Sequence, residues 1–83
     1  MNETKSIQVK VVAFGVLQEI IGTSSLQIEC LPELSWVKDF LLQSYPGLSK
    51  QHIQFAVNKQ LVSDNITLSE GCEIALLPPF SGG

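Results

Sequence analysis

Hydrophobic and polar residues alternate in two segments near the start of the chain, at 7–14 and 25–30. In the first segment the apolar positions of one phase are Ile7, Val9, Val11 and Ala13. In the second they are Leu26, Ile28 and Cys30. This period of two predicts two strands, each with one buried face. The second strand ends at Leu31 and Pro32, because proline cannot donate a hydrogen bond to a sheet.

Helical spacing follows each of these strands. Residues 16–21 carry apolar side chains at helical intervals, and Gly22 can supply a left-handed stop, so we expect one short helical turn there. A longer helix is expected over residues 36–44, with Ser35 as its N-cap and with Pro46 and Gly47 marking its end. Its apolar stripe is formed by Val37, Phe40, Leu41 and Tyr45.

The second half of the chain predicts a hairpin and a last strand. Residues 53–57 and 60–62 read as strands joined by a tight turn at Asn58 and Lys59, since asparagine tolerates positive φ. A second turn contains Gly71. Residues 74–77 are apolar at every position, which favours a strand in the middle of a sheet.

These elements predict an α+β domain in which one main helix lies across one face of a mixed sheet. The other face is expected to be partly open. Leu76 and Leu77 point to opposite faces of the last strand, so one of them is expected beneath the helix and the other in an exposed apolar patch. We predict a folded domain over residues 1–77 and an extended tail over residues 78–83.

Composition narrows the class of protein. The 83 residues leave room for one domain, and with 45% hydrophobic residues the chain is too apolar to be disordered. No stretch is long enough for a membrane span, and the polar residues 1–6 do not form a leader, which predicts a cytoplasmic protein with no membrane partner. The net charge of −3 argues against nucleic-acid binding and favours a basic partner.

The side chains that most often carry chemistry are sparse. Cys30 and Cys72 are far apart and lack metal-ligand spacing, so we expect free thiols and no metal site, with Cys30 in the core. His52 in its polar loop is expected to be solvated. Trp36 and Tyr45 can anchor an interface, but their positions at the two ends of one helix favour packing against the sheet margins. Glu70 and Glu73 flank a turn and are expected to be solvated, although they can meet a basic partner.

The segment L-L-P-P-F-S-G-G points to chemistry at the C-terminal carboxylate. Pro78 and Pro79 make a stiff spacer, and residues 78–83 can span roughly 20 Å at about 3.3 Å per residue. Phe80 can fix the depth of insertion into a pocket, while Gly82 and Gly83 fit a channel too narrow for side chains. A carboxylate must be activated, for example as an acyl-adenylate, before a nucleophile can attack it. A frayed and inert end is the alternative.

The segment E-G-C-E-I-A-L-L-P-P-F-S-G-G, with F-A-V-N at residues 55–58, resembles the family of small sulfur-carrier subunits of molybdopterin synthase. The V-K-V-V-A-F strand, the E-I-I-G turn and the helix before Pro46 come in that family's order, so the resemblance covers nearly the whole chain. It implies the ubiquitin-like β-grasp fold. It also implies that Gly83 bears the sulfur, that Gly82 threads beside it, and that Leu77, Pro78, Pro79, Phe80 and Ser81 help the tail to enter a partner.

The resemblance implies a cycle with catalysis by partner proteins. A ubiquitin-activating-like adenylyltransferase uses ATP to adenylate Gly83, and a sulfur donor converts it to a thiocarboxylate. The tail then enters the large subunit of molybdopterin synthase, in an assembly of two small and two large subunits, and gives its sulfur to cyclic pyranopterin monophosphate. The carrier itself holds no cofactor and no metal, and its catalytic side chains are expected on the large subunit.

Two positions depart from the pattern of the family. Gln18 stands where an arginine is expected, and Cys72 replaces an acid, which affects any charge contact made there. Cys72 is expected to have no catalytic role. Related carriers serve thiamine synthesis or tRNA thiolation, and ubiquitin-like modifiers are joined to lysines, so these functions stay open beside the first. A β-grasp interaction module with an inert tail is the remaining alternative.

Overall fold

The computed structural model of the protein describes residues 6–78. Its elements are β1 (Ile7–Ala13), α1 (Val16–Ile21), β2 (Ser25–Cys30), α2 (Leu34–Ser44), the 3-10 helix η1 (Pro46–Lys50), β3 (Gln54–Val57), β4 (Gln60–Val62) and β5 (Glu73–Leu77). All five strands and both helices expected from the sequence are therefore present.

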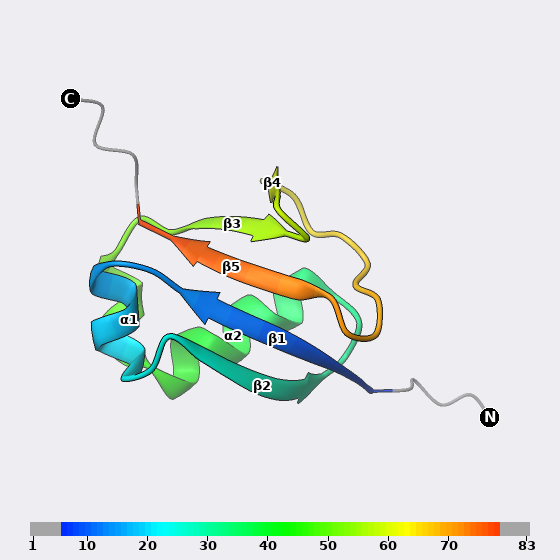
Figure 1. The fold of residues 1–83 in the computed structure, drawn as a ribbon, viewed down its shortest axis with the longest axis horizontal. Helices are drawn as coiled ribbons and strands as arrows, with labels where there is room; N and C mark the ends of the chain where they lie inside the picture. The colour runs from blue at the N-terminus through cyan, green and yellow to red at the C-terminus, as the bar shows by residue number, and fades with distance from the viewer. Residues whose placement is uncertain (1–5, 79–83) are drawn as a thin grey trace.

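The strands form one mixed sheet, and α2 crosses one of its faces (Figure 1). Within residues 6–78 the order of the five strands is β2-β1-β5-β3-β4. The first and last strands are parallel, with Val11 beside Ile74, and the other neighbouring strands are antiparallel. The predicted α+β architecture and the central place of the last strand are both confirmed.

The core lies between the sheet and the helices. Its fully buried side chains come from alternate positions of β1 and β5 and from one side of α1 and α2, with Leu48 added by η1. They include Val9, Val11, Leu17, Leu34, Val37, Leu41, Leu48, Ile74 and Leu76. Aliphatic side chains of this kind each contribute about 1.5–3 kcal/mol when removed from water.

The two leucines at the end of β5 lie on opposite faces, as predicted. Leu76 is 0% exposed beneath the helices, whereas Leu77 is half-buried on the face that α2 leaves open. We expect Leu76→Ala to lower the free energy of unfolding by about 2–5 kcal/mol, because it leaves a cavity in the core. Leu77→Ala is the matched control, with an expected loss below about 1.5 kcal/mol. Urea denaturation measures both, and equal losses would contradict this placement.

The predicted start of the main helix was wrong. Helix α2 begins at Leu34 with Glu33 as its N-cap, and no side chain of the cap residue closes the first turn. Instead the Asn65 Oδ1 atom accepts the Ser35 N–H at 2.8 Å, and the Ile66 carbonyl accepts the Leu34 N–H at 3.0 Å. Hydrogen-bond acceptors in the loop before β5 therefore bind the free N–H groups at this end of the helix. Local sequence rules for capping do not predict such distant acceptors.

This capping arrangement can be tested with two substitutions. We expect Asn65→Ala to lower the free energy of unfolding by about 0.5–2 kcal/mol, because the Ser35 N–H loses its acceptor. Ser35→Ala, at the residue that the sequence predicted as the cap, is expected to cost less than about 0.5 kcal/mol. Thermal and urea denaturation of the two variants distinguish the two capping residues, and a larger loss for Ser35→Ala would refute the role of Asn65.

Other boundaries and faces differ slightly from the expectations. Phe14 lies outside β1, β3 begins one residue later than expected, and η1 was not predicted. The apolar stripe of α2 includes Leu34 but not Phe40, which is 36% exposed and stacks on Trp36 with ring centroids 5.5 Å apart. Trp36 and Tyr45 pack partly buried against the core, as predicted.

The predicted hairpin turn is confirmed and is tied to β5. Asn58 and Lys59 both have positive φ, at 50° and 73°, which suits a two-residue turn between twisted strands. The Asn58 N–H donates to the Glu73 carbonyl at 2.8 Å, and its Oδ1 accepts the Glu73 N–H at 3.0 Å. Asn58 therefore fixes the hairpin to the start of the last strand.

Candidate functional site

The candidate site begins where the chain leaves the centre of the sheet. Strand β5 ends at Leu77, which pairs with Gln54 of β3 on one side (Figure 1). On its other side the Phe14 N–H donates to the Leu76 carbonyl at 3.3 Å. Leu77 and Pro78 form the tail root, the base from which the predicted tail continues. Because β5 is held on both sides, the tail root has a fixed position and direction.

The turn between β1 and α1 supports this tail root. Gly15 has φ 60° and ψ −136°, a conformation that residues with a Cβ rarely adopt. A Cβ built on Gly15 lies 3.5 Å from the Pro78 Cγ atom, so the backbone of Gly15 passes close to the proline ring. The glycine therefore permits the turn, and the turn lies against the first residue of the predicted tail.

The structure describes only part of the predicted site. Leu77 is half-buried at the end of β5, and Pro78 is half-buried beside Gly15. Pro79, Phe80, Ser81, Gly82 and Gly83 lie outside the described residues. Their predicted roles in threading and in carrying sulfur thus stay predictions.

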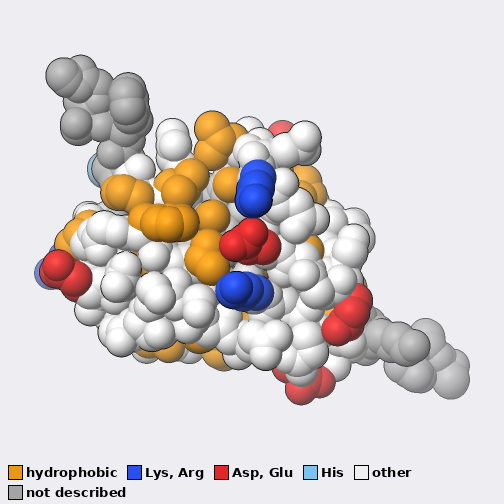
Figure 2. Space-filling model, viewed as in Figure 1, with side chains coloured by type: hydrophobic (Ala, Val, Ile, Leu, Met, Phe, Trp, Pro, Cys, Tyr) orange, Lys and Arg blue, Asp and Glu red, His pale blue; other side chains and the backbone are white. Residues whose placement is uncertain are grey.

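An apolar patch lies beside the tail root on the face of the sheet away from α2. We call it the open-face patch, and it consists of Val12, Phe14, Ala56, Leu61, Ala75 and Leu77. These residues line a shallow hollow of about 380 Å³. Phe14 is 48% exposed and Leu61 is 66% exposed, and Figure 2 shows hydrophobic side chains gathered on this face. A contiguous exposed patch of this kind is typical of a protein interface.

Charged residues border the open-face patch (Figure 2). Lys10 pairs with Glu73 in the register of β1 and β5, and both Glu73 and Lys59 line the hollow. The sequence predicted that either Leu76 or Leu77 would join an exposed patch, and in the structure it is Leu77. It did not identify Phe14 and Leu61 in the patch or Lys59 beside it. A signal was present, because Val12 and Phe14 are apolar at positions whose phase points away from the core.

The two cysteines lie in the core of the domain. Cys30 and Cys72 are buried and free. Cys30 pairs with Ile7 on one side of β1, and the Cys72 carbonyl accepts the Lys10 N–H on the other. Two strand spacings are about 9.6 Å, which exceeds the roughly 7 Å that a disulfide allows between Cα atoms. Cys72 lies before β5, at the opposite end of that strand from Pro78.

The surroundings of Cys30 also favour its neutral thiol over the reactive thiolate. Burial, followed by the neighbouring Cys72 and Glu70, raises the pKa of the Cys30 thiol above its ordinary value. The folded state disfavours the thiolate, so this contribution to stability is complete below about pH 9 and decreases at higher pH.

We expect iodoacetamide to label Cys30 at pH 8 at least about tenfold more slowly in the folded protein than in urea, because the buried thiol must first be exposed. Mass spectrometry of the labelled peptide measures the two rates. Equal rates in both states would contradict the burial of this side chain.

The other side chains considered as candidates do not form a catalytic or metal-binding group among residues 6–78. His52 is exposed, as predicted. Within residues 6–78 no three His, Cys, Asp or Glu side chains are grouped so that they can hold a metal ion. Among the same residues no helix is long and apolar enough to cross a membrane. The tail root and the open-face patch are therefore the features that best define a site.

Comparison with known proteins decides the family. The ThiS family model matches residues 11–83. This chain belongs to the ThiS family. A relative from Chlamydomonas reinhardtii, named molybdopterin synthase sulfur carrier subunit, is 32% identical over 84 residues, which cover 93% of this chain and 100% of the relative. The matched region of this ThiS-family protein includes the tail root and the predicted tail.

Solved structures of similar fold support the same family. The small archaeal modifier protein 1 from Methanosarcina acetivorans has a TM-score of 0.80 and 26% identity, over 95% of this chain and 99% of that one. Another neighbour comes from the protein-protein complex of subunits 1 and 2 of the molybdopterin-converting factor from Helicobacter pylori. It has a TM-score of 0.71 and 30% identity, over 93% of this chain and 100% of that one. The fold of this ThiS-family protein is the ubiquitin-like β-grasp, as the resemblance implied.

Proposed function

We propose that this protein is the sulfur carrier of a molybdopterin synthase and that it works through the carboxyl group of Gly83. The observation that carries the proposal is the tail root, which lies at the end of the central strand beside an exposed apolar patch. Membership of the ThiS family and the names of the curated relatives support it. No side chain of this chain needs to act as a catalyst in this scheme.

The proposed chemistry has three steps. The Gly83 carboxylate attacks the α-phosphate of ATP in an activating enzyme, which forms an acyl-adenylate and releases pyrophosphate. Sulfur at the sulfide level from a donor then displaces AMP, and the product is a thiocarboxylate. In the large subunit the thiocarboxylate sulfur bonds to a carbon of cyclic pyranopterin monophosphate and displaces an oxygen substituent there. Water then hydrolyses the acyl–sulfur bond, which leaves the sulfur on the pterin and returns Gly83 to a carboxylate. Two loaded carriers supply the two sulfurs of the dithiolene.

The open-face patch is the proposed docking surface for the large subunit. Phe14 and Leu61 offer exposed apolar area close to the tail root, so docking there aligns the tail with a channel in the partner. Lys10, Glu73 and Lys59 beside the patch can fix the orientation through complementary charges. The proposed assembly has two small and two large subunits, as the resemblance implies.

Intact-mass measurement tests the proposed loading step. After incubation with ATP, an adenylyltransferase and a sulfur donor, the chain should gain about 16 Da, the difference between one sulfur and one oxygen atom. Omission of ATP is the control and should prevent the gain. The proposal fails if no gain appears with an activating enzyme that loads a known carrier in parallel, or if the gain persists after Gly83 is removed.

A second candidate is a protein modifier, and the similarity to the small archaeal modifier protein favours it. In that case the activated Gly83 carboxyl forms an amide with a lysine of another protein. Carriers for thiamine synthesis or tRNA thiolation would share the loading step but deliver sulfur elsewhere. Affinity purification separates these roles. Recovery of a large synthase subunit supports the carrier for molybdopterin synthase, and recovery of a thiazole synthase or tRNA-thiolating enzyme supports a carrier for those pathways. Lysine conjugates support the modifier.

A further inference from the structure

A second hollow surface lies on the helix side of the sheet and meets the open-face hollow at Gln54 and Leu61. We call it the helix–hairpin groove, and it is lined by Lys38 and Leu42 of α2, by Ile53 and Phe55 beside and within β3, and by Val62 of β4. Two adjoining hollows of about 430 and 270 Å³ share Lys38, Ile53 and Phe55. Together they fall within the size range of typical ligand sites, which is about 300–1,000 Å³.

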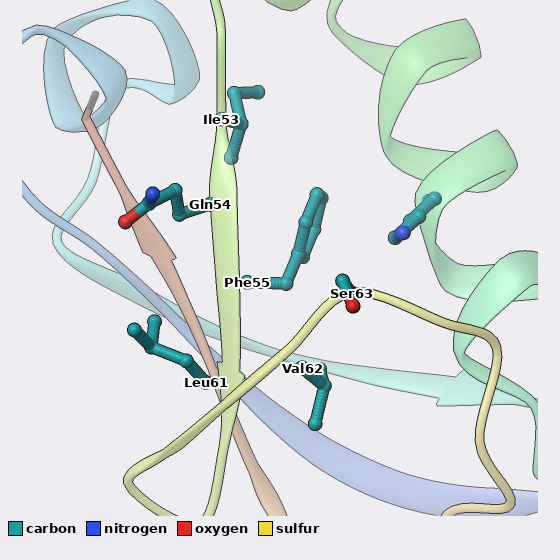
Figure 3. Close-up of a pocket in the computed structure, with 7 residues that line it drawn as sticks. Ile53, Gln54, Phe55, Leu61, Val62 and Ser63 are labelled. Carbon is teal, nitrogen blue, oxygen red and sulfur yellow. The ribbon is translucent and has the colours of Figure 1, made fainter. Parts of the chain in front are cut away.

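The groove is lined by apolar side chains, by neutral polar residues such as Ser49, Gln51 and Ser63, and by one cation, Lys38. Figure 3 shows Phe55 projecting toward α2, whereas Gln54 and Leu61 point the other way. The Lys38 Nζ atom lies 4.9 Å from the centroid of the Phe55 ring. Such a cation–π contact holds the ammonium over an apolar surface, where it is less hydrated than a lysine in open solvent.

The charge in the groove is opposite to that of the whole protein. The chain carries a net charge of −3, yet among the residues that the structure describes, none of those lining the two hollows is acidic. Lys38 is thus positioned to attract an anionic group from outside, and Ile53, Leu42 and Val62 offer apolar contacts on both sides of it.

Strand β4 adds a third feature suited to a peptide. It is the edge strand at one end of the sheet order and consists of residues 60–62. Its outer backbone groups have no neighbouring strand among residues 6–78. An extended segment lying in the groove can therefore make backbone hydrogen bonds to this edge while its side chains fill the hollows.

We propose that the helix–hairpin groove binds an extended, largely aliphatic peptide segment of a partner protein, with one Asp or Glu carboxylate of that segment beside Lys38. The groove lies on the helix side of the sheet, whereas the docking surface proposed above lies on the open face, and Gln54 and Leu61 line hollows on both. The proposal is independent of sulfur transfer, because it concerns neither Gly83 nor the tail root.

Selection from a random peptide library displayed on phage tests the proposal. We expect the selected peptides to combine aliphatic residues with Asp or Glu and to shift the amide resonances of Ile53, Phe55 and Val62 in ¹⁵N-labelled protein. Replacing the peptide carboxylate by its amide should weaken binding about tenfold, since a partly desolvated charge contact is lost. Higher salt should also weaken it.

Matched variants localise the effect to Lys38. Lys38→Met keeps the aliphatic stem over Phe55 and removes the charge, so it should weaken peptide binding about tenfold, and Lys38→Glu should weaken it further. Lys10→Glu, on the open face, should change the affinity less than about twofold. The proposal is overturned if no peptide is selected, if the peptides shift resonances of the open-face patch instead, or if the Lys38 variants bind normally. Shifts of the groove resonances with protein concentration alone would assign the groove to a second copy of the chain and would also overturn it.

Discussion

Deletion of Gly83 is expected to reduce thiocarboxylate formation by at least about a hundredfold, because the reacting carboxyl is then one residue short of the activated phosphate. Addition of one residue after Gly83 should have an effect of similar size, since the new carboxyl no longer belongs to the position that the channel selects. The gain in intact mass during incubation with ATP, activating enzyme and sulfur donor measures both effects.

The matched control for these length changes is Ser81→Ala, which keeps the length of the tail and both terminal glycines. It should load within about threefold of the unaltered chain, because a backbone channel needs no hydroxyl at that position. Circular dichroism should show the same fold for all variants. Normal loading of the shortened and extended chains would instead support the interaction module with an inert tail.

Truncation of Phe14 to alanine is expected to weaken binding to the large subunit by about 2 kcal/mol, or roughly thirtyfold in Kd. Phe14 is 48% exposed in the free protein and adjoins the tail root, so its ring is available to fill a pocket in a partner. The stability of the Phe14→Ala variant should differ little from that of the unaltered protein, because the Phe14 side chain is outside the core. Isothermal titration calorimetry with the purified large subunit measures the affinity.

Phe40→Ala provides the matched control for this interface. Phe40 is also exposed, but it stacks on Trp36 of α2 rather than lining the open-face patch. Its truncation should change the affinity less than about twofold. An equal loss for both variants, or none for Phe14→Ala, would show that the large subunit does not dock on the open face.

Much of the fold was predictable because its strands and helices are locally encoded. Alternation in 7–13 and 25–30 identifies β1 and β2, and the positive φ values of Asn58 and Lys59 fit the turn expected there. The start of α2 was not predictable in the same way. The Ser35 N–H at this helix end donates to the side chain of Asn65, 30 residues further along the chain, so only the folded chain brings donor and acceptor together.

The candidate site was predictable in part for a similar reason. The central position of β5 and the opposite faces of Leu76 and Leu77 follow from an apolar strand, but only the structure shows that Leu77 is the outward one. The position of Leu61 in the patch and that of Lys59 beside it depend on how the hairpin packs beside β5, which is a tertiary contact. The groove beside Lys38 likewise needs the distance between α2 and β3, which no local pattern specifies.

The central place of β5 has a consequence for synthesis of the protein on the ribosome. Residues 73–77 are made after every other strand, yet they pair with both β1 and β3. A nascent chain that stops before them lacks the middle of its sheet and cannot bury Val9 and Val11 properly. Prematurely terminated copies should therefore stay unfolded and be degraded by proteases. In this way the topology withholds a stable domain from products that end before β5.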